Sequence, residues 1–290
     1  MNDFVILTDS CCDLPAELAG KEGISVIPLT VTLEGKEYRN MLDGSDIASE
    51  DFYARLRNGA LATTSAASVG MFQDAMEPIL KEGKDILCIA FSSGLSSTCS
   101  SAQIAAGELS ERYPEQKVYV VDSLCASLGQ GLLVYRACRK KESGASIEEV
   151  RDWLEENKLS LCHWFTVDSL SHLRRGGRLS SAKALLGSLL HVKPVLHMDN
   201  DGHLINMETV RGRKIALKRL TEKMAELATD PQTQTVFISH ADDIEAAELV
   251  ASDVRERFGI KDILISSIGP VIGAHCGPGT VALFFLGKER

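Results

Sequence analysis

Short apolar runs alternate with amphipathic helical patterns along the first 155 residues, and this alternation limits the possible folds more than any other feature. Strands separated by helices pair in parallel through right-handed crossovers, which leaves helices on both faces of the sheet. The expected strands cover residues 4–9, 23–35, 85–93 and 117–123, and the second is either one strand or two strands joined near Pro28. The expected helices cover residues 46–59, 69–83, 97–113, 127–144 and 146–159.

Two of these helices carry end signals. Asp46 is expected to cap the start of the first helix, and Gly59 is expected to end it. Ser146 and Glu149 have the spacing of a capping box.

The pattern changes near residue 160, where a second α/β unit begins with a strand. Residues 191–210 predict a hairpin, because the turn sequence Asn200-Asp201-Gly202 separates two apolar runs. Helices are expected at 212–228 and 243–259, and strands at 235–242, 262–270 and 280–287. The fold class is therefore α/β. We expect an N-terminal domain over residues 1–158 with a mainly parallel sheet, and a C-terminal domain over residues 159–290 with a mixed sheet.

Composition excludes several classes of function. The net charge of −9 argues against a broad nucleic-acid surface. No apolar run reaches the about 20 residues that span a bilayer, and the start "MNDFVILTDS" reads as a buried strand rather than a signal peptide. The eight cysteines form no C-x-x-C pair and no zinc spacing. We expect a cytoplasmic protein with free thiols and no metal.

A serine-rich turn and helix start follow the strand expected at 85–93. Six serines lie between residues 92 and 101, and Ser93 and Ser96 precede the helix. The unpaired amides of a helix start attract anions. The segment lacks the phosphate-binding loop motifs, so it suits a carboxylate better than a nucleotide. The alternative is that the serines only cap the helix.

Two further polar segments are candidates for the same site. Residues 62–68, "ATTSAAS", are expected to form a loop that carries Thr64 and Ser65. Residues 268–280, "IGPVIGAHCGPGT", are expected to form a glycine loop that closes over a ligand and brings His275 to it. For each segment a purely structural role is the alternative. Asp-Ser pairs also end three expected strands, at 9–10, 122–123 and 168–169, where they either cap the next helix or face a ligand.

Basic residues gather in "LRRGGRLS" (173–180) and "VRGRK" (210–214) of an otherwise acidic chain. They indicate either a solvated face or a positive patch that receives a phosphate or an acidic partner.

Together these motifs resemble the DegV family of bacterial fatty-acid-binding proteins. The resemblance runs in order through "ILTDSCCDLP", "TTSAAS", "FSSGLSST", "VYVVDS", "LRRGGRLSSAKALLGSLLHVKPVL", "TVRGRKIAL" and "GPVIGAHCGPGT". It implies a long-chain fatty acid of the C16–C18 class held between the two domains, with no other cofactor and no catalytic residue in this chain. It places the carboxylate at Thr64 and Ser65, at Ser96 with Ser93 as a second donor, and at His275.

The resemblance also implies a partner, the kinase subunit that converts the bound acid to an acyl phosphate. The acyl chain would run into an apolar tunnel, and Arg178 and Arg211 would lie near the mouth of this tunnel or on the surface that faces the kinase. Transient membrane contact is compatible with such a carrier. The chain departs from the family pattern at Ala66-Ala67, at Ser97, and at Cys11-Cys12. The alternative function is a hydrolase that uses Ser96, His275 and either Asp9 or Asp122. However, "GLSST" is an incomplete nucleophile motif.

Overall fold

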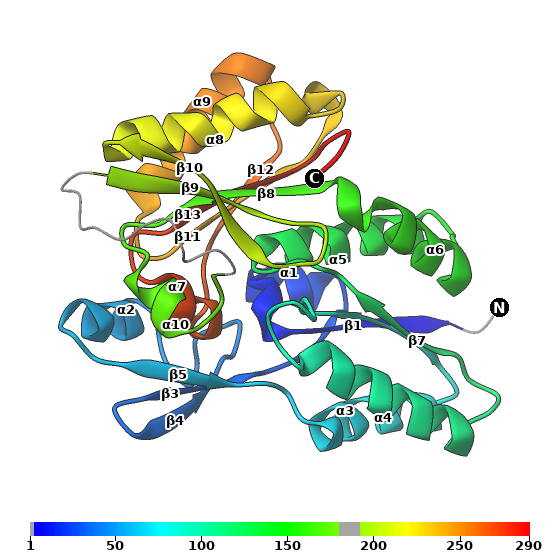
Figure 1. The fold of residues 1–290 in the computed structure, drawn as a ribbon. Coiled ribbons are helices and arrows are strands. Elements are labelled where there is room, and N and C mark those ends of the chain that lie inside the picture. Colours follow the sequence, from blue (N-terminus) through cyan, green and yellow to red (C-terminus); the bar gives the residue numbers. More distant parts are fainter. Residues whose placement is uncertain (1–2, 180–191) are drawn as a thin grey trace.

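The structure, a computed structural model, describes residues 3–179 and 192–290. The described residues form three sheets, and Figure 1 shows the two larger ones stacked with helices between and around them. Sheet A has four parallel strands in the order β2-β1-β6-β7. The strands are β1 (Phe4–Asp9), β2 (Ser25–Ile27), β6 (Asp85–Ala90) and β7 (Val118–Asp122).

Helices cover both faces of sheet A, as the alternating pattern predicted. α3 and α4 pack on one face, and α5 and α6 pack on the other. β6 is buried along its whole length, which explains its unbroken apolar run. These helices are α3 (Val69–Lys81), α4 (Thr98–Arg112), α5 (Leu128–Glu142) and α6 (Ile147–Asn157), and α6 begins with the predicted Ser146–Glu149 capping box.

Among the described residues, sheet C has six strands in the order β10-β9-β8-β13-β11-β12, of which β11 and β12 pair in parallel and the other neighbours pair antiparallel. The predicted mixed sheet and hairpin are therefore confirmed, although residue 191 of the hairpin lies outside the described residues. α8 and α9 cover the outer face, and α5 contacts the inner face (Figure 1). The elements are β8 (Leu161–Thr166), β9 (Val192–Met198), β10 (Leu204–Arg211), α8 (Arg213–Leu227), β11 (Val236–His240), α9 (Ile244–Phe258), β12 (Ile263–Ser267) and β13 (Val281–Leu286).

A small antiparallel sheet, in the order β4-β3-β5, was not predicted. Residues 23–35 divide at Pro28 into β2 of sheet A and β3 (Thr30–Leu33) of this sheet, so the two-strand reading is correct. The predicted loop at 62–68 is wrong in its first half, because β5 (Ala62–Ser65) pairs with β3. The third strand is β4 (Lys36–Arg39), which pairs with the other side of β3.

The helix expected at 46–59 begins three residues later than predicted. α2 (Ser49–Arg57) follows Ala48, and the Asp46 carboxylate instead accepts a hydrogen bond from the Arg39 amide. The Asp46 cap is therefore wrong, because a contact with β4 holds its side chain.

The predicted glycine loop at 268–280 is also wrong, because it contains the helix α10 (Pro270–Cys276). Proline at the first helical position loses no internal hydrogen bond, so Pro270 starts this helix rather than breaking it. Gly277 and Gly279, at φ 79° and 80°, form the turn that follows. His275 therefore sits on the last turn of a rigid element.

The described residues form two buried cores. One runs from residues of sheet A to the inner face of sheet C, and the second lies under α8 and α9. The domain boundary at 158 stays a prediction. No helix in the described part of the chain has both the length and the apolarity to cross a bilayer. The short helices are the 3-10 turns η1 (Ser10–Cys12), η2 (Lys158–Ser160) and η4 (Pro231–Thr233), with α1 (Ala16–Lys21) and α7 (Ser171–Arg175).

Candidate functional site

A cavity of about 230 Å³ lies where β5, α10 and the β6–α4 loop meet. Its apolar walls include Leu29, Phe91, Leu95, Leu173, Val271 and Ile272. Its polar lining comprises Thr64, Ser65, Ser96, Ser97, Arg178 and His275. A mostly apolar cavity with a few convergent polar groups is the usual form of a small-molecule site.

The centre of the polar end is a contact between β5 and α10. The Thr64 hydroxyl lies 2.8 Å from Nε2 of His275. Both side chains are partly buried, and the two residues are 211 positions apart in the sequence. The contact therefore depends on the tertiary fold.

His275 is held neutral at physiological pH. Burial, followed by the positive charge of Arg178, lowers the pKa of His275 to about 4. Its second ring nitrogen, Nδ1, is buried and has no hydrogen-bond partner among the described residues. Gly176 lies so close to Nδ1 that any side chain there would overlap the ring. A neutral imidazole has one donor and one acceptor nitrogen, so Nε2 can either donate to the Thr64 hydroxyl or accept from it.

Ser96 lines the cavity just before α4. Its hydroxyl accepts a hydrogen bond from the Thr98 amide at 3.2 Å and lies 2.9 Å from the Thr98 hydroxyl. Its neighbour Ser97, one of the six serines of this segment, also lines the cavity. Ser93 is exposed and outside the cavity lining, and its amide donates to Asp122.

The two predicted arginines differ in position. Arg178 lines the cavity, where its guanidinium donates to the carbonyl oxygens of Leu95 and Gly176. It joins the loop after α7 to the loop before α4 and places a positive charge beside His275. Arg211 is exposed at the end of β10 and is not part of the cavity lining.

A smaller inner cavity of about 50 Å³ adjoins the first. The two share four lining residues, Ala126, Leu204, Ile272 and Cys276. Deeper residues of the inner cavity are Phe165, Met198, Ala282 and Phe284, which belong to or follow strands of sheet C. The polar end thus leads into an apolar slot between sheet C and the segment before α5.

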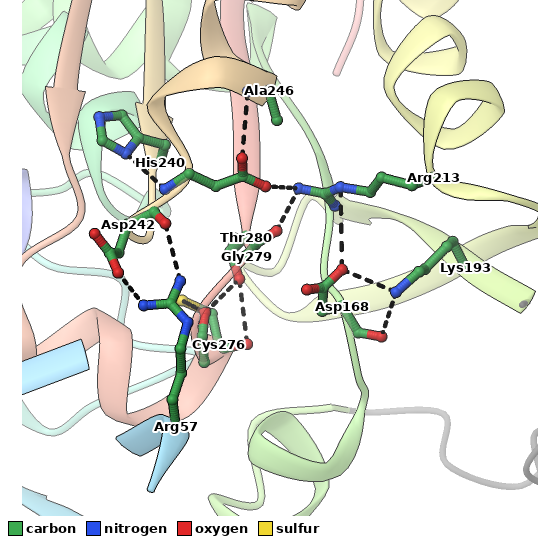
Figure 2. A network of polar contacts seen from close by, with 12 residues as sticks. Arg57, Asp168, Lys193, Arg213, His240, Asp242, Ala246, Cys276, Gly279 and Thr280 are labelled. Carbon is green, nitrogen blue, oxygen red and sulfur yellow. Dashed lines mark hydrogen bonds and ion pairs between the residues drawn. The ribbon is translucent and has the colours of Figure 1, made fainter. Parts of the chain in front are cut away.

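The C-terminal end of α10 is anchored by a polar network (Figure 2). The Thr280 hydroxyl lies 3.2 Å from the Cys276 carbonyl and 2.9 Å from the Gly277 carbonyl. Arg213 from α8 contacts the Gly279 carbonyl and pairs with Asp243. These contacts fix the turn directly after His275.

The structure does not assemble the triad of the hydrolase alternative in its described residues. The buried Asp9 carboxylate accepts from the amides of Cys11 and Phe91. Asp122 accepts from the amides of Ser93 and Leu124. His275 contacts Thr64, and Ser96 contacts Thr98, so neither aspartate orients the histidine and the histidine does not contact the serine.

One group of side chains has the spacing of a metal site. In the part of the chain that the structure describes, ligand atoms of Asp199, Asp201 and His203 lie within 4.8 Å of one another. Asp199 accepts from the amides of both other residues, which accounts for its position in the β9–β10 turn. We therefore assign this group to the turn.

Known proteins are similar to this chain in sequence and in fold along nearly their whole length. The sequence profile described as "Uncharacterised protein, DegV family" matches residues 3–288. The chain belongs to the DegV family. A DegV domain-containing protein of Clostridium perfringens is 46% identical over 290 residues, covering 100% of this chain and 99% of the relative.

Two solved DegV structures match the fold of this DegV chain closely. One is described by the words "Fatty Acid Binding of a DegV family Protein from Thermus thermophilus", with a TM-score of 0.88 and 32% identity over 99% of this chain and 100% of the other. The second is DegV from Bacillus subtilis, described as "a fatty acid binding protein", with a TM-score of 0.85, 32% identity and the same coverage.

Proposed function

We propose that this DegV protein binds a long-chain fatty acid, with the carboxylate at Thr64, Ser65, Ser96 and His275 and the acyl chain in the apolar slot. The observation that carries the proposal is the Thr64–His275 contact at the polar end of a cavity whose other end is apolar. Support comes from the two related proteins described as fatty-acid-binding. Ser93 lies outside the cavity lining, so we assign it no direct contact with the carboxylate.

The energetics favour this ligand class. Burying roughly 14 to 18 methylenes at about 0.8 kcal/mol each gives on the order of 10 kcal/mol before the costs of association. A carboxylate in a partly buried site needs hydrogen-bond donors, because an unpaired buried charge is expensive. The hydroxyls of Thr64, Ser65 and Ser96 supply neutral donors, and Arg178 adds a positive potential at the cavity edge.

Calorimetric titration of the delipidated protein tests the proposal. Stearate should bind with one site per chain, and stearyl alcohol should bind more weakly because it lacks the carboxylate. A chromogenic ester should show no turnover. Equal affinity for acid and alcohol would contradict the assigned polar end, and ester turnover that depends on Ser96 and His275 would favour the hydrolase.

The proposal includes a role as a carrier rather than an enzyme, in the cytoplasm, with a fatty acid kinase as partner. The neutral donors leave the carboxylate without a lysine clamp that would compete with phosphorylation. Reconstitution with a bacterial fatty acid kinase and ATP should yield acyl phosphate, trapped as the hydroxamate, only when the DegV protein is present. Failure of this transfer while stearate still binds would remove the kinase step and leave the binding function.

We propose that the exposed Arg211 contacts that kinase. Arg211→Ala should slow acyl phosphate formation and leave stearate affinity unchanged. Arg255→Ala, on the exposed surface of α9, is the matched control and should change neither. Equal rates for the two variants would remove Arg211 from the interface.

A further inference from the structure

A buried carboxylate joins the two halves of the molecule behind the candidate site. Asp13 follows η1 with φ 49° and is 3% exposed. Its Oδ2 accepts a hydrogen bond from the Ser127 hydroxyl at 2.6 Å, and its Oδ1 accepts one from the Gly269 amide at 2.9 Å. Its backbone carbonyl accepts from the Ser266 hydroxyl at 3.1 Å. One residue from the N-terminal part thus holds α5 and the β12–α10 loop together.

The contact with Gly269 falls at the N-terminal end of the helix that carries His275. Gly269 directly precedes α10, and Pro270 has no amide hydrogen, so the Gly269 amide is the first donor at this helix end. A Cβ atom at Gly269 would lie 2.8 Å from Oδ1 of Asp13, so the close approach requires glycine. His275 lies six residues further on, about 9 Å along the helix axis.

We propose that Asp13 is the positioning residue for His275, because its carboxylate fixes the start of α10 and thereby aligns the imidazole with Thr64 at the carboxylate-binding end. The other end of α10 is fixed by Thr280 and by the contacts of Arg213 in Figure 2. Tyr53 adds a third hold, since its hydroxyl donates to the Ile268 carbonyl at 2.8 Å. The inference rests on the proposed fatty-acid site.

The ionised form of Asp13 gives the stronger hold. Burial raises the pKa of Asp13 to about 7, so the group changes charge near neutral pH. A carboxylate accepts from both Ser127 and Gly269, and a hydrogen bond to a charged group is the stronger kind. The protonated acid instead has a proton to donate. Ser127 can receive it, because its hydroxyl lies 3.0 Å from the Ser239 hydroxyl and has a second partner there.

Of the titratable groups that face Asp13, Asp9 is the one expected to change charge in an overlapping pH range. These neighbours are Asp9, whose pKa burial raises to about 6, the buried thiols Cys11, Cys12 and Cys276, and the Tyr53 phenol. Burial raises the pKa of the thiols and the phenol, so these groups stay neutral. Removing the Asp13 charge alone separates its response from that of Asp9.

The test compares Asp13→Asn with the matched control Asp85→Asn. Asp85 is also 3% exposed, but it lies at the start of β6, whereas the cavity lies beyond the end of that strand. Its carboxylate accepts a hydrogen bond from the Lys117 amide. At pH 8, Asp13→Asn should bind stearate about tenfold more weakly than wild type, the effect of one charge-assisted hydrogen bond. In Asp13→Asn, the NMR resonances of the ¹³C-labelled His275 ring should shift relative to wild type. Asp85→Asn should change neither the stearate affinity nor these resonances. The stearate affinity of wild type should approach that of Asp13→Asn as the pH falls from 8 to 6.

The proposal that Asp13 positions His275 can be overturned by either of two results. Unshifted His275 resonances and wild-type affinity in Asp13→Asn overturn the inference, as does an equal loss in Asp85→Asn. If Asp13→Asn does not fold, Ser127→Ala keeps the charge and removes one partner, and it must shift the same resonances. If wild type binds no fatty acid at all, the proposed function fails, and the His275 resonances still test whether Asp13 positions the ring.

Discussion

Replacing Thr64 with valine removes the hydroxyl that contacts His275 while keeping the shape of the side chain. In the structure this hydroxyl is 2.8 Å from Nε2, and the other ring nitrogen already has no partner among the described residues. The ligand would therefore lose one donor, and the imidazole would lose its partner. A hydrogen bond to a charged group contributes about 1.5–3 kcal/mol, so fatty-acid affinity should fall by about 10- to 100-fold.

Displacement of a fluorescent fatty acid measures the effect, with Thr63→Val as the matched control. Thr63 is the adjacent residue of β5, is exposed and is not part of the cavity lining, so its variant should bind as wild type does. A double-mutant cycle of Thr64→Val with His275→Ala should show non-additive losses, because the two groups are in contact. Wild-type affinity in Thr64→Val, or equal losses in both threonine variants, would refute the assigned carboxylate site.

Three further predictions address stability, chain length and the histidine pocket. Burial raises the pKa of Asp9 and Asp13 to about 6 and about 7, so the folded state holds these protons more tightly than the unfolded chain. Their stabilising contribution is complete below pH 4 and is lost through pH 6–7, by about 1.4 kcal/mol per pH unit and group. Denaturation at pH 5 to 8 should show Asp13→Asn with a shallower decline than wild type, and parallel curves would contradict the assignment. Ala282→Leu should fill the inner cavity and shift the binding preference toward shorter acyl chains, measured by competition between acids of different length. An unchanged order of affinities would show that the acyl chain does not enter the inner cavity. Gly176→Ala should displace His275 and weaken binding at least tenfold, as about 1.4 kcal/mol of strain would do, and a crystal structure with an unmoved ring would disprove this steric argument.

The strand and helix order of both halves was predictable because each buried segment carries its own apolar period. β6 is apolar after its first residue, Asp85, and is buried throughout, and the Asn200-Asp201-Gly202 turn identifies the β9–β10 hairpin. Such signals are local, so they survive without knowledge of the tertiary fold.

The errors occurred where tertiary contacts overrule local signals. Residues 62–65 are polar and read as a loop, yet pairing with β3 makes them a strand. The glycines of residues 268–280 indicated a loop, although Pro270 was a usable helix-start signal. Asp46 has the character of a cap, but the Arg39 amide engages its side chain.

The polar residues of the site could be named from the sequence, but their grouping around one carboxylate came from the family resemblance and not from any local pattern. Thr64 and His275 meet only because β5 and α10 contact each other in the fold. Ser93 and Ser96 belong to one serine-rich segment, yet Ser96 lines the cavity and Ser93 does not, and the part played by Gly176 depends on one close contact. None of these facts has a local signature.

The central claim, that the slot behind Thr64 and His275 holds a fatty acid, is tested most directly by solvent extraction of the purified protein and mass spectrometry of the extract. The account predicts one long-chain fatty acid per chain, and a reduced amount from His275→Ala purified in parallel. An empty protein that also takes up no added fatty acid would contradict it.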